Sequence, residues 1–218
     1  MFILEKITKS FLLKSGERRY IFRDLSLTIP KLNLAILGKN GAGKSTLLSL
    51  ISGSTMPDSG KIITQCNVSW PVGLQSGFQG SMTGRENVLF VCRIHGYSLH
   101  YAKKKAVFVN DFAELGDYFD MPVKTYSSGM KSRLGFGLSM AFDFDVYLID
   151  EAISVGDPSF KKKSSQVFEE KRKKSNIIMV SHSVSTIKQW CDVAIYLENG
   201  ICQFYENLDE AIKRYNSV

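Results

Sequence analysis

The segment that decides the fold is Gly38-Lys39-Asn40-Gly41-Ala42-Gly43-Lys44-Ser45, which fits the pattern GxxxxGK[ST] at every fixed position. It follows the apolar run Leu34 to Leu37 and precedes residues 44–52, whose apolar side chains recur at helical spacing. A strand, a glycine-rich turn and a helix in this order predict a phosphate-binding loop. The glycines let successive backbone N–H groups point at an anion, and the helix N-terminus adds partial positive charge. Lys44 would reach the outer phosphates of a nucleotide, and the Ser45 hydroxyl would ligate Mg²⁺.

Two adjacent carboxylates follow a second apolar run. Residues Val146 to Ile149 lead directly into Asp150 and Glu151. Ligands of α/β sheets bind at the carboxyl ends of the parallel strands, so we expect both carboxylates at the same sheet edge as the phosphate loop. Asp150 would support Mg²⁺, directly or through water, and Glu151 would orient and polarise the attacking water.

Short apolar runs alternate with helical stretches, which predicts an α/β fold with a mainly parallel sheet and helices on both sides. Thr83 and Glu86 form a capping-box pattern at the start of one helix, and residues 78–143 predict a helical subdomain within a single domain spanning 1–218. The first 30 residues indicate antiparallel strands with a turn near Ser15-Gly16. Strands are expected at 34–37, 146–149, 177–180 and 193–197, and helices at about 44–52, 84–95, 100–115, 130–142, 159–174, 184–190 and 208–216.

Composition excludes several classes of protein. Apolar residues make up 44% of the chain and the formal net charge is only +7, so the chain is not disordered as a whole. No apolar run approaches the roughly 20 residues of a spanning helix, and the four scattered cysteines favour a reducing compartment over a metal or disulfide framework. Residues 159–175 concentrate lysines on a helix whose apolar face holds Phe160, Val167 and Phe168. A solvated helix face is the simpler interpretation, and attraction to anionic lipid or nucleic acid is the alternative.

Three further segments complete an ordered set of motifs. Tyr126-Ser127-Ser128-Gly129-Met130 ends 20 residues before Asp150, Ser154-Val155-Gly156-Asp157 follows the carboxylates, and Ser181-His182-Ser183 follows the run 177–180. Each is a weak signal alone. Taken in order with the phosphate loop and the carboxylate pair, they resemble the nucleotide-binding domain of ABC transporters over nearly the whole chain.

The resemblance implies a P-loop NTPase core of the ABC ATPase type, with an N-terminal antiparallel β subdomain and a helical signature subdomain. Residues 38–46 stand for the Walker A loop, 126–130 for the LSGGQ signature and 150–151 for the Walker B pair. Phe11 resembles the aromatic residue that stacks on adenine, with Tyr20 as a second candidate. ATP binding is thereby expected at Gly38, Lys39, Asn40, Gly41, Ala42, Gly43, Lys44, Ser45, Thr46, Phe11, Ser127, Ser128, Gly129 and the D-loop residue Asp157. Catalysis is expected from Lys44, Glu151 and the switch histidine His182, and Mg²⁺ binding from Ser45, Asp150, Gln75 and Gln79.

The chain departs from the family's patterns at three places. The signature keeps Ser127 and Gly129 but differs at its other positions, and the D-loop reads Ser-Val-Gly-Asp instead of the usual Ser-Ala-Leu-Asp. Gln75 and Gln79 both precede the run 83–87 at suitable spacing, so either is a candidate for the Q-loop glutamine.

These departures resemble the polysaccharide-exporting branch of the family. The segments 69–87 and 126–136 are most similar to the ATP-binding proteins of capsular polysaccharide export in Gram-negative bacteria. The resemblance implies a head-to-tail homodimer in which Ser127 and Gly129 of one copy cover the ATP held by Lys44 of the other. It further implies an integral membrane permease subunit, capsule-export proteins of the periplasm and membrane, and a peripheral location at the cytoplasmic face of the inner membrane. No nucleic-acid partner is expected.

Other functions stay open at this point. Within the family, the chain could serve an importer or an exporter of lipid or O-antigen. A soluble ABC ATPase acting on DNA or the ribosome is disfavoured, because only residues 47–125 separate the phosphate loop from the signature and one nucleotide domain is present. A nucleotide-binding regulator without hydrolysis is disfavoured by Lys44, Asp150, Glu151 and His182.

Overall fold

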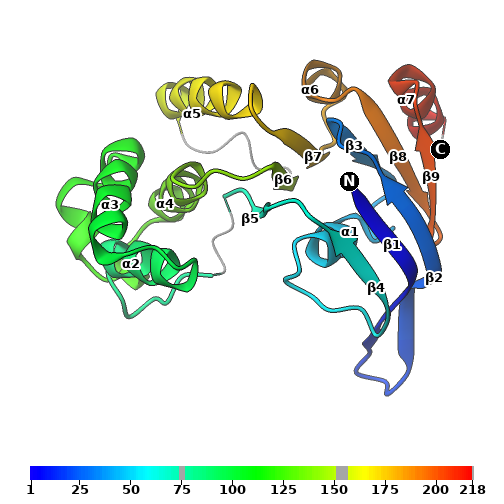
Figure 1. Cartoon of the computed structure of the whole chain (residues 1–218), viewed down its shortest axis with the longest axis horizontal. Coiled ribbons are helices and arrows are strands. Elements are labelled where there is room, and N and C mark those ends of the chain that lie inside the picture. The colour runs from blue at the N-terminus through cyan, green and yellow to red at the C-terminus, as the bar shows by residue number, and fades with distance from the viewer. Residues whose placement is uncertain (74–76, 151–156, 218) are drawn as a thin grey trace. The chain divides into compact units, whose positions relative to one another are not determined.

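The computed structural model describes residues 1–73, 77–150 and 157–217. Its chain divides into two compact units, each described here by itself (Figure 1). The first unit comprises Met1–Pro71, Phe144–Glu151 and Lys174–Val218, and the second comprises Val72–Asp143 and Ala152–Lys173. The basic helix expected at 159–174 therefore groups with the helical residues of the second unit. The organisation into one nucleotide-binding domain stays a prediction.

The first unit is built on a six-stranded sheet with the order β5-β6-β7-β3-β8-β9. Every neighbouring pair is parallel except β8 and β9, so the prediction of a mainly parallel sheet is confirmed. All four predicted strands are present, and their apolar residues are buried, as a sheet covered on both faces requires. The strands are β5 (Val68–Pro71), β6 (Val146–Asp150), β7 (Asn176–Val180), β3 (Leu34–Leu37), β8 (Val193–Glu198) and β9 (Ile201–Tyr205).

Three helices and a second sheet complete the first unit. Helix α1 (Lys44–Ile51) lies on one face of the six-stranded sheet, and α6 (Val184–Trp190) and α7 (Leu208–Asn216) lie on the other (Figure 1). The second sheet is antiparallel with the order β2-β1-β4, as predicted for the N-terminus. Its strands are β1 (Phe2–Leu12), β2 (Arg18–Ile29) and β4 (Ser59–Thr64). Buried residues of β1, α1 and β3 share one hydrophobic cluster, which fixes the phosphate loop between the two sheets.

The second unit is helical. It contains α2 (Gly84–Ile94), α3 (Leu99–Ala113), α4 (Ser128–Met140), α5 (Pro158–Arg172) and two short 3₁₀ helices at Gly116–Asp120 and Val123–Thr125. The predicted capping box is confirmed: the Glu86 N–H donates to the Thr83 hydroxyl at 3.0 Å, and the Thr83 N–H donates to the Glu86 carboxylate at 2.8 Å. Phe112, Phe136 and Phe160 join α3, α4 and α5 through ring contacts with centroid distances of 5.4 to 6.3 Å.

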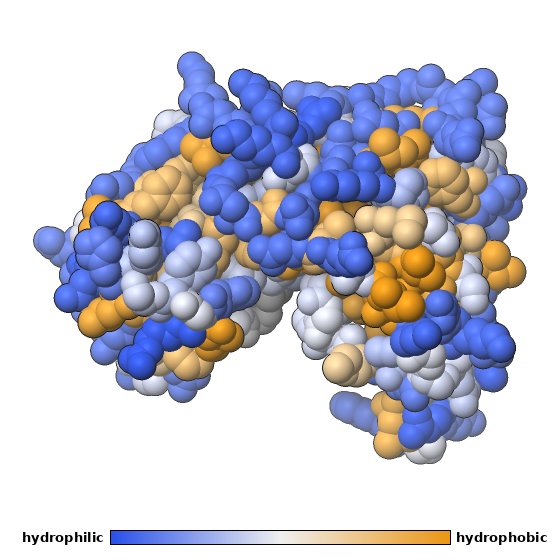
Figure 2. All heavy atoms as spheres, viewed as in Figure 1, coloured by the Kyte–Doolittle hydropathy of each residue, from blue (hydrophilic) through white to orange (hydrophobic). Residues whose placement is uncertain are grey.

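Apolar side chains remain exposed on two helices of the second unit. On the face shown in Figure 2, hydrophobic residues interrupt the hydrophilic surface of α2 and α3. Phe90 is 54% exposed, Ile94 66% and Leu99 57%. An exposed cluster of this kind suits contact with another protein. None of the helices in the described ranges is both long and apolar enough to cross a bilayer.

Candidate functional site

The phosphate loop joins β3 to α1 in a conformation that only glycine allows at two positions. A Cβ atom on Gly38 would lie 2.3 Å from the Leu197 carbonyl oxygen, and a Cβ atom on Gly43 would lie 2.5 Å from the Ile21 side chain. Gly43 also has φ +106° directly before α1 begins at Lys44. The glycines of the motif therefore let the loop pass close to β8 and β2 while its backbone curls around the helix N-terminus.

Lys44 is buried and lies within the loop. Only 8% of Lys44 is exposed, and its Nζ donates to the carbonyl oxygens of Gly38 at 2.7 Å and Lys39 at 3.0 Å. A buried ammonium group needs such acceptors, because desolvation of an unpaired charge is costly. These bonds keep the positive charge at the centre of the loop, next to the positive end of α1.

A cavity of about 440 Å³ in the first unit gathers nine of the predicted site residues. Its volume falls within the range of small-molecule sites. The predicted residues that line it come from β1, the phosphate loop and the carboxyl ends of β6 and β7. They are Phe11, Asn40, Gly41, Gly43, Lys44, Ser45, Thr46, Asp150 and His182.

The structure distinguishes the two aromatic candidates. Phe11 is 46% exposed and lines the same cavity as Lys44. Tyr20 lines a different cavity, and the Arg23 guanidinium lies 3.6 Å from the centre of its ring. The exposed Phe11 ring is therefore the one placed to stack on a base whose phosphates occupy the loop. This role of Phe11 remains a prediction.

Some residues at or beside this cavity were not predicted as site residues from the sequence. Arg19 and Ile21, alternate residues on β2, line the cavity together with Phe11. The Tyr215 hydroxyl on α7 lies 2.9 Å from Nδ1 of His182. The tyrosine is 33 residues from the histidine in sequence, and α7 packs against β8, β3 and β9 of the sheet in which β7 precedes His182. Tyr215 thus helps to orient an exposed imidazole.

The donors at one end of the cavity suit Mg²⁺. The hydroxyl of Ser45 and the carboxylate of Asp150 are hard oxygen ligands, and both residues line the cavity. Mg²⁺ typically takes one or two protein oxygens together with substrate phosphates and water. Among the residues that the structure describes, no group of three or more His, Cys, Asp and Glu side chains forms a complete metal cage. A cation held jointly with a nucleotide fits this donor set.

The Ser-Ser-Gly loop and Asp157 lie together in the second unit. Ser127 caps α4, and its hydroxyl accepts the Met130 N–H at 3.2 Å, so the helix begins two residues earlier than predicted. Ser127, Gly129 and Asp157 line a cavity of about 470 Å³, and Ser128 is exposed beside them. The second unit therefore presents the predicted signature residues on an open surface.

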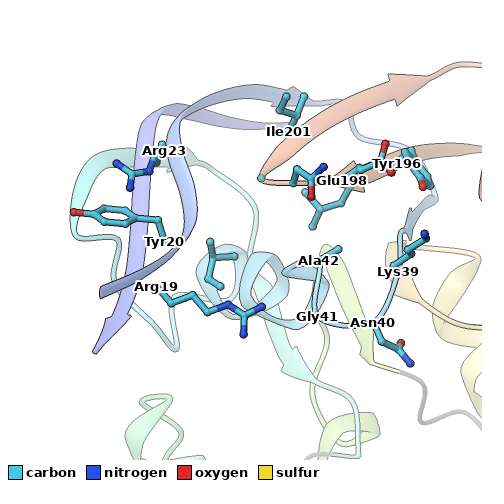
Figure 3. A pocket seen from close by; sticks show the side chains of 14 residues that line it. Arg19, Tyr20, Arg23, Lys39, Asn40, Gly41, Ala42, Tyr196, Glu198 and Ile201 are labelled. Atoms are coloured by element: carbon cyan, nitrogen blue, oxygen red, sulfur yellow. The ribbon is translucent and has the colours of Figure 1, made fainter. Parts of the chain in front are cut away.

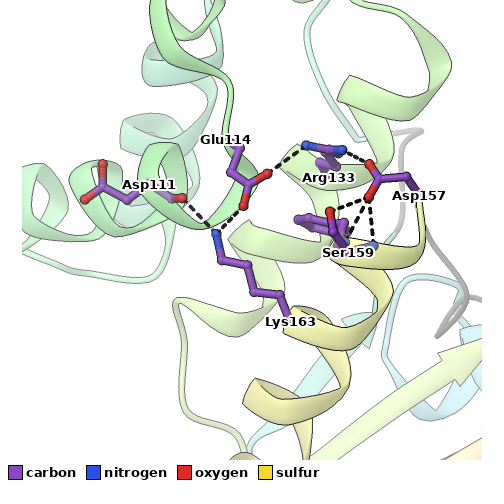
Figure 4. A network of polar contacts seen from close by, with 7 residues as sticks. Asp111, Glu114, Arg133, Asp157, Ser159 and Lys163 are labelled. Atoms are coloured by element: carbon purple, nitrogen blue, oxygen red, sulfur yellow. Dashed lines mark hydrogen bonds and ion pairs between the residues drawn. The ribbon is translucent and has the colours of Figure 1, made fainter.

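A network of ion pairs fixes Asp157 next to this loop (Figure 4). Arg133 on α4 bridges the carboxylates of Asp157 and Glu114, with 3.2 Å to Glu114. Lys163 on α5 pairs with the other oxygen of Glu114 at 2.8 Å. The Ser159 hydroxyl donates to Asp157, and this bond, then the Phe160 N–H and the Arg133 charge, hold the pKa of Asp157 well below its usual range. The charge of Asp157 thus stabilises the start of α5 and its contact with α4.

We expect Asp157→Asn to lower the free energy of unfolding at neutral pH and to have less effect in acid. The folded protein binds the Asp157 proton more weakly than the unfolded chain does, because its folded pKa is lowered. The stabilisation is therefore complete above the unfolded pKa and is lost as the pH falls through the folded pKa. Asn still caps a helix, so the substitution isolates the charge.

Urea unfolding at pH 7 and at about pH 3 measures this difference. The matched control is Asp111→Asn, because the Asp111 carboxylate makes no ion pair within the described part of the chain. An effect of Asp157→Asn that is equal at both pH values would contradict the expectation.

Some predicted residues cannot be placed at the site. Gln75, Glu151 and the D-loop residues 154–156 lie outside the described residues. Gln79 is exposed in the second unit, where its N–H donates to the Asn87 side chain at 2.8 Å and its amide donates to Ser81 at 3.4 Å. Its role toward Mg²⁺ stays a prediction, as does that of Gln75.

The fold and the loop together define the class of protein. A glycine-rich loop between a central parallel strand and a helix, with a carboxylate at the end of a neighbouring strand, is the arrangement of a P-loop NTPase. The ABC transporter family matches residues 22–154, and the chain belongs to this family. It is an ATPase of the ABC type, and it binds ATP.

Relatives agree with this assignment, and a solved structure agrees with the fold. The chain is 55% identical to the polysialic acid transport ATP-binding protein KpsT of Escherichia coli, over 99% of this chain and 96% of that protein. It is 47% identical to the capsule polysaccharide export ATP-binding protein CtrD of Neisseria meningitidis serogroup B, over the full length of both. The fold is similar to the ATP-binding cassette MJ0796 in its dimeric, post-hydrolysis state with ADP and Pi, with a TM-score of 0.74 and 21% identity over 95% of this chain and 99% of that one.

Proposed function

We propose that the chain is the ATP-hydrolysing subunit of a transporter that exports capsular or related surface polysaccharide. The observation that carries the proposal is the similarity to KpsT and CtrD along nearly the full chain. An importer, or an exporter of lipid or O-antigen, would share the phosphate loop. The branch-specific segments favour the capsule exporter.

The catalytic chemistry is assigned to residues of the first unit. Lys44 holds the outer phosphates of ATP, and the Phe11 ring stacks on adenine. Ser45 and Asp150 would hold Mg²⁺, which neutralises charge on the bound phosphates. Glu151 orients and polarises the attacking water, and His182, oriented by Tyr215, contacts the γ-phosphate. The placement of five of these side chains, those of Phe11, Lys44, Ser45, Asp150 and His182, around one cavity supports the assignment.

The mechanical step is assigned to a pair of chains. Ser127 and Gly129 of one copy cover the ATP bound at Lys44 of the other, so that two nucleotides are enclosed in a head-to-tail dimer. The exposure of the Ser127–Gly129 loop on the second unit supports this, because a loop already packed against its own chain could not serve a partner. The closed dimer binds ATP more tightly than the open one, and this difference in affinity drives the motion of a membrane partner.

The membrane partner is a separate permease, with capsule-export proteins of the periplasm and membrane beside it. Its cytosolic helix docks near residues 75–100, where the exposed Phe90, Ile94 and Leu99 supply apolar contact area. The chain thereby sits at the cytoplasmic face of the inner membrane. On the basic helix α5, Lys163 and Lys171 are engaged by Glu114 and Asp143, so part of its charge serves the fold.

Co-purification from membranes tests the proposal. Tagged Glu151→Gln protein is expected to retain bound ATP with Mg²⁺ and to bring with it a polytopic membrane protein and a capsule-export protein, identified by mass spectrometry. The matched control carries Lys44→Met as well, which removes the ATP-dependent closed state. Recovery of ribosomes or DNA in place of a membrane protein would show that the proposal is wrong.

A further inference from the structure

A second cavity in the first unit lies on the other side of the phosphate-loop residues 39–42, and no step assigned above uses its remaining walls. Its volume is about 740 Å³. Figure 3 shows its walls: the start of β2 with Arg19, Tyr20 and Arg23, the phosphate loop from Lys39 to Ala42, and the hairpin between β8 and β9. Arg19, Asn40 and Gly41 also line the cavity of about 440 Å³ that contains Lys44, which is called the ATP cavity from here on. The two cavities therefore share one wall.

The walls of this second cavity are held rigidly by backbone contacts. Asn199 and Gly200 form the tight turn between β8 and β9, with φ +51° and +79°. A Cβ atom on Gly200 would lie 2.7 Å from the Ile21 carbonyl oxygen, so the turn packs directly against β2. Gly38 approaches Leu197 as closely on the other side. A ligand would therefore meet a cavity that is already formed, with little ordering cost.

The charge of the cavity is strongly positive. Arg19, Arg23 and Lys39 contribute three cations, and none of them makes an ion pair within the part of the chain that the structure describes. Glu198 is the single carboxylate among the lining residues, and Arg214 on α7 pairs with it at 3.0 Å. The negative charge of the wall is thus compensated from outside the cavity, and the three cations are left for an external anion.

One guanidinium is oriented in advance. Arg23 stacks over Tyr20, with 3.6 Å between the guanidinium carbon and the ring centre. Such a contact restricts the side chain while leaving its N–H groups available in a planar fork. This fork matches the oxygens of a phosphate group, and the compact ammonium of Lys39 adds a point charge.

We propose that this cavity binds a phosphate ester or diphosphate, and that its occupant weakens ATP binding in the neighbouring cavity. A phosphate group bears up to about two negative charges, which suits three cations better than a single carboxylate does. The volume admits more than one such group, so the ligand is a free phosphate ester or the headgroup of a phospholipid. Arg19 borders both cavities and cannot neutralise both anions fully, so the coupling is negative and, by linkage, reciprocal.

Calorimetry on the full chain tests binding without relying on ATP turnover. The background is Lys44→Met, which weakens phosphate binding in the ATP loop, and the probes are pyrophosphate and vesicles containing phosphatidic acid. Arg23→Gln with Lys39→Gln is expected to weaken binding by about tenfold or more. The control Lys161→Gln with Lys162→Gln removes the same charge from α5 and is expected to change binding less than about twofold.

The two probes identify the source of the phosphate group. Binding of pyrophosphate indicates a soluble ester, and binding of the vesicles alone indicates a lipid headgroup. Both results support the proposal when they depend on Arg23 and Lys39. Absence of binding by either probe, or an equal loss in the control variant, overturns it. Circular dichroism and the unfolding midpoint of each variant establish that the fold is kept.

Kinetics test the coupling, which rests on ATP occupying the first cavity. The KM for ATP is expected to rise by about threefold or more beyond its rise in Arg23→Gln when the probe is present with the wild type, because competition of the probe at the ATP loop is common to both proteins. Arg23 does not line the ATP cavity, so without the probe both proteins are expected to have the same KM. If Arg23→Gln raises the KM without any probe, the second cavity belongs to the ATP site and the proposal is wrong.

Discussion

Lys44→Met is expected to abolish tight ATP binding and to lower ATP turnover by roughly a hundred- to a thousandfold, the usual effect of removing one preorganised electrostatic group. Among the described residues that line the ATP cavity, Lys44 is the cation that belongs to the phosphate loop, and it is buried there. Methionine keeps the length and the apolar stem, so the loss reports the charge and its N–H donors. Equilibrium binding of a fluorescent ATP analogue and release of phosphate measure the two effects.

The control is Lys61→Met in β4. Lys61 pairs with Glu5 at 3.1 Å on the exposed surface of the first unit, away from both cavities. Exposed ion pairs contribute little to stability, so this variant is expected to bind and hydrolyse ATP as the wild type does. Tight ATP binding by Lys44→Met with unchanged turnover would contradict the assignment of the loop.

Local sequence signals predicted the fold well where the structure depends on neighbouring residues. The phosphate loop needs glycine at positions where a Cβ atom would strike β8 or β2, and the spacing of those glycines is visible in one segment. Helix starts were predicted through capping residues such as Thr83, whose partner Glu86 is three positions away. The end of α3 at Ala113, two residues earlier than predicted, follows from the left-handed conformation of Glu114 at φ +54°. No sequence pattern signalled that conformation at a glutamate.

Contacts between distant segments were not predictable from the sequence. The choice between Phe11 and Tyr20 depends on the register of β1 and β2, in which Phe11 pairs with Arg19 and Tyr20 pairs with Ser10. Phe11 and Arg19 are paired and therefore lie on the same face of the sheet. Tyr20 is the next residue after Arg19, and neighbouring residues of a strand point to opposite faces, so Tyr20 lies on the other face. The contact of Tyr215 with His182 likewise depends on the packing of α7 and has no sequence signature.

Glu151→Gln is expected to lower ATP turnover by about 10²- to 10⁴-fold while ATP binding is kept. An amide has the size of the carboxylate but cannot polarise the attacking water or accept its proton. The phosphate loop that holds ATP is unchanged in this variant. Glu151 lies outside the described residues, so the expectation rests on its position directly after Asp150, which ends β6 at the ATP cavity. Steady-state phosphate release and equilibrium ATP binding separate the two effects.

The matched control is Glu170→Gln, an exposed carboxylate on α5 that is expected to leave both quantities unchanged. With ATP and Mg²⁺, Glu151→Gln is also expected to accumulate as a dimer in size-exclusion chromatography, because hydrolysis no longer opens the closed pair. Lys44→Met is expected to lose ATP binding and turnover together, whereas Glu151→Gln is expected to lose turnover alone. Comparison of the two variants therefore distinguishes a nucleotide-binding residue from a residue that acts in hydrolysis. If Glu151→Gln still turns over ATP at the wild-type rate, the assignment of Glu151 is wrong and another residue activates the attacking water.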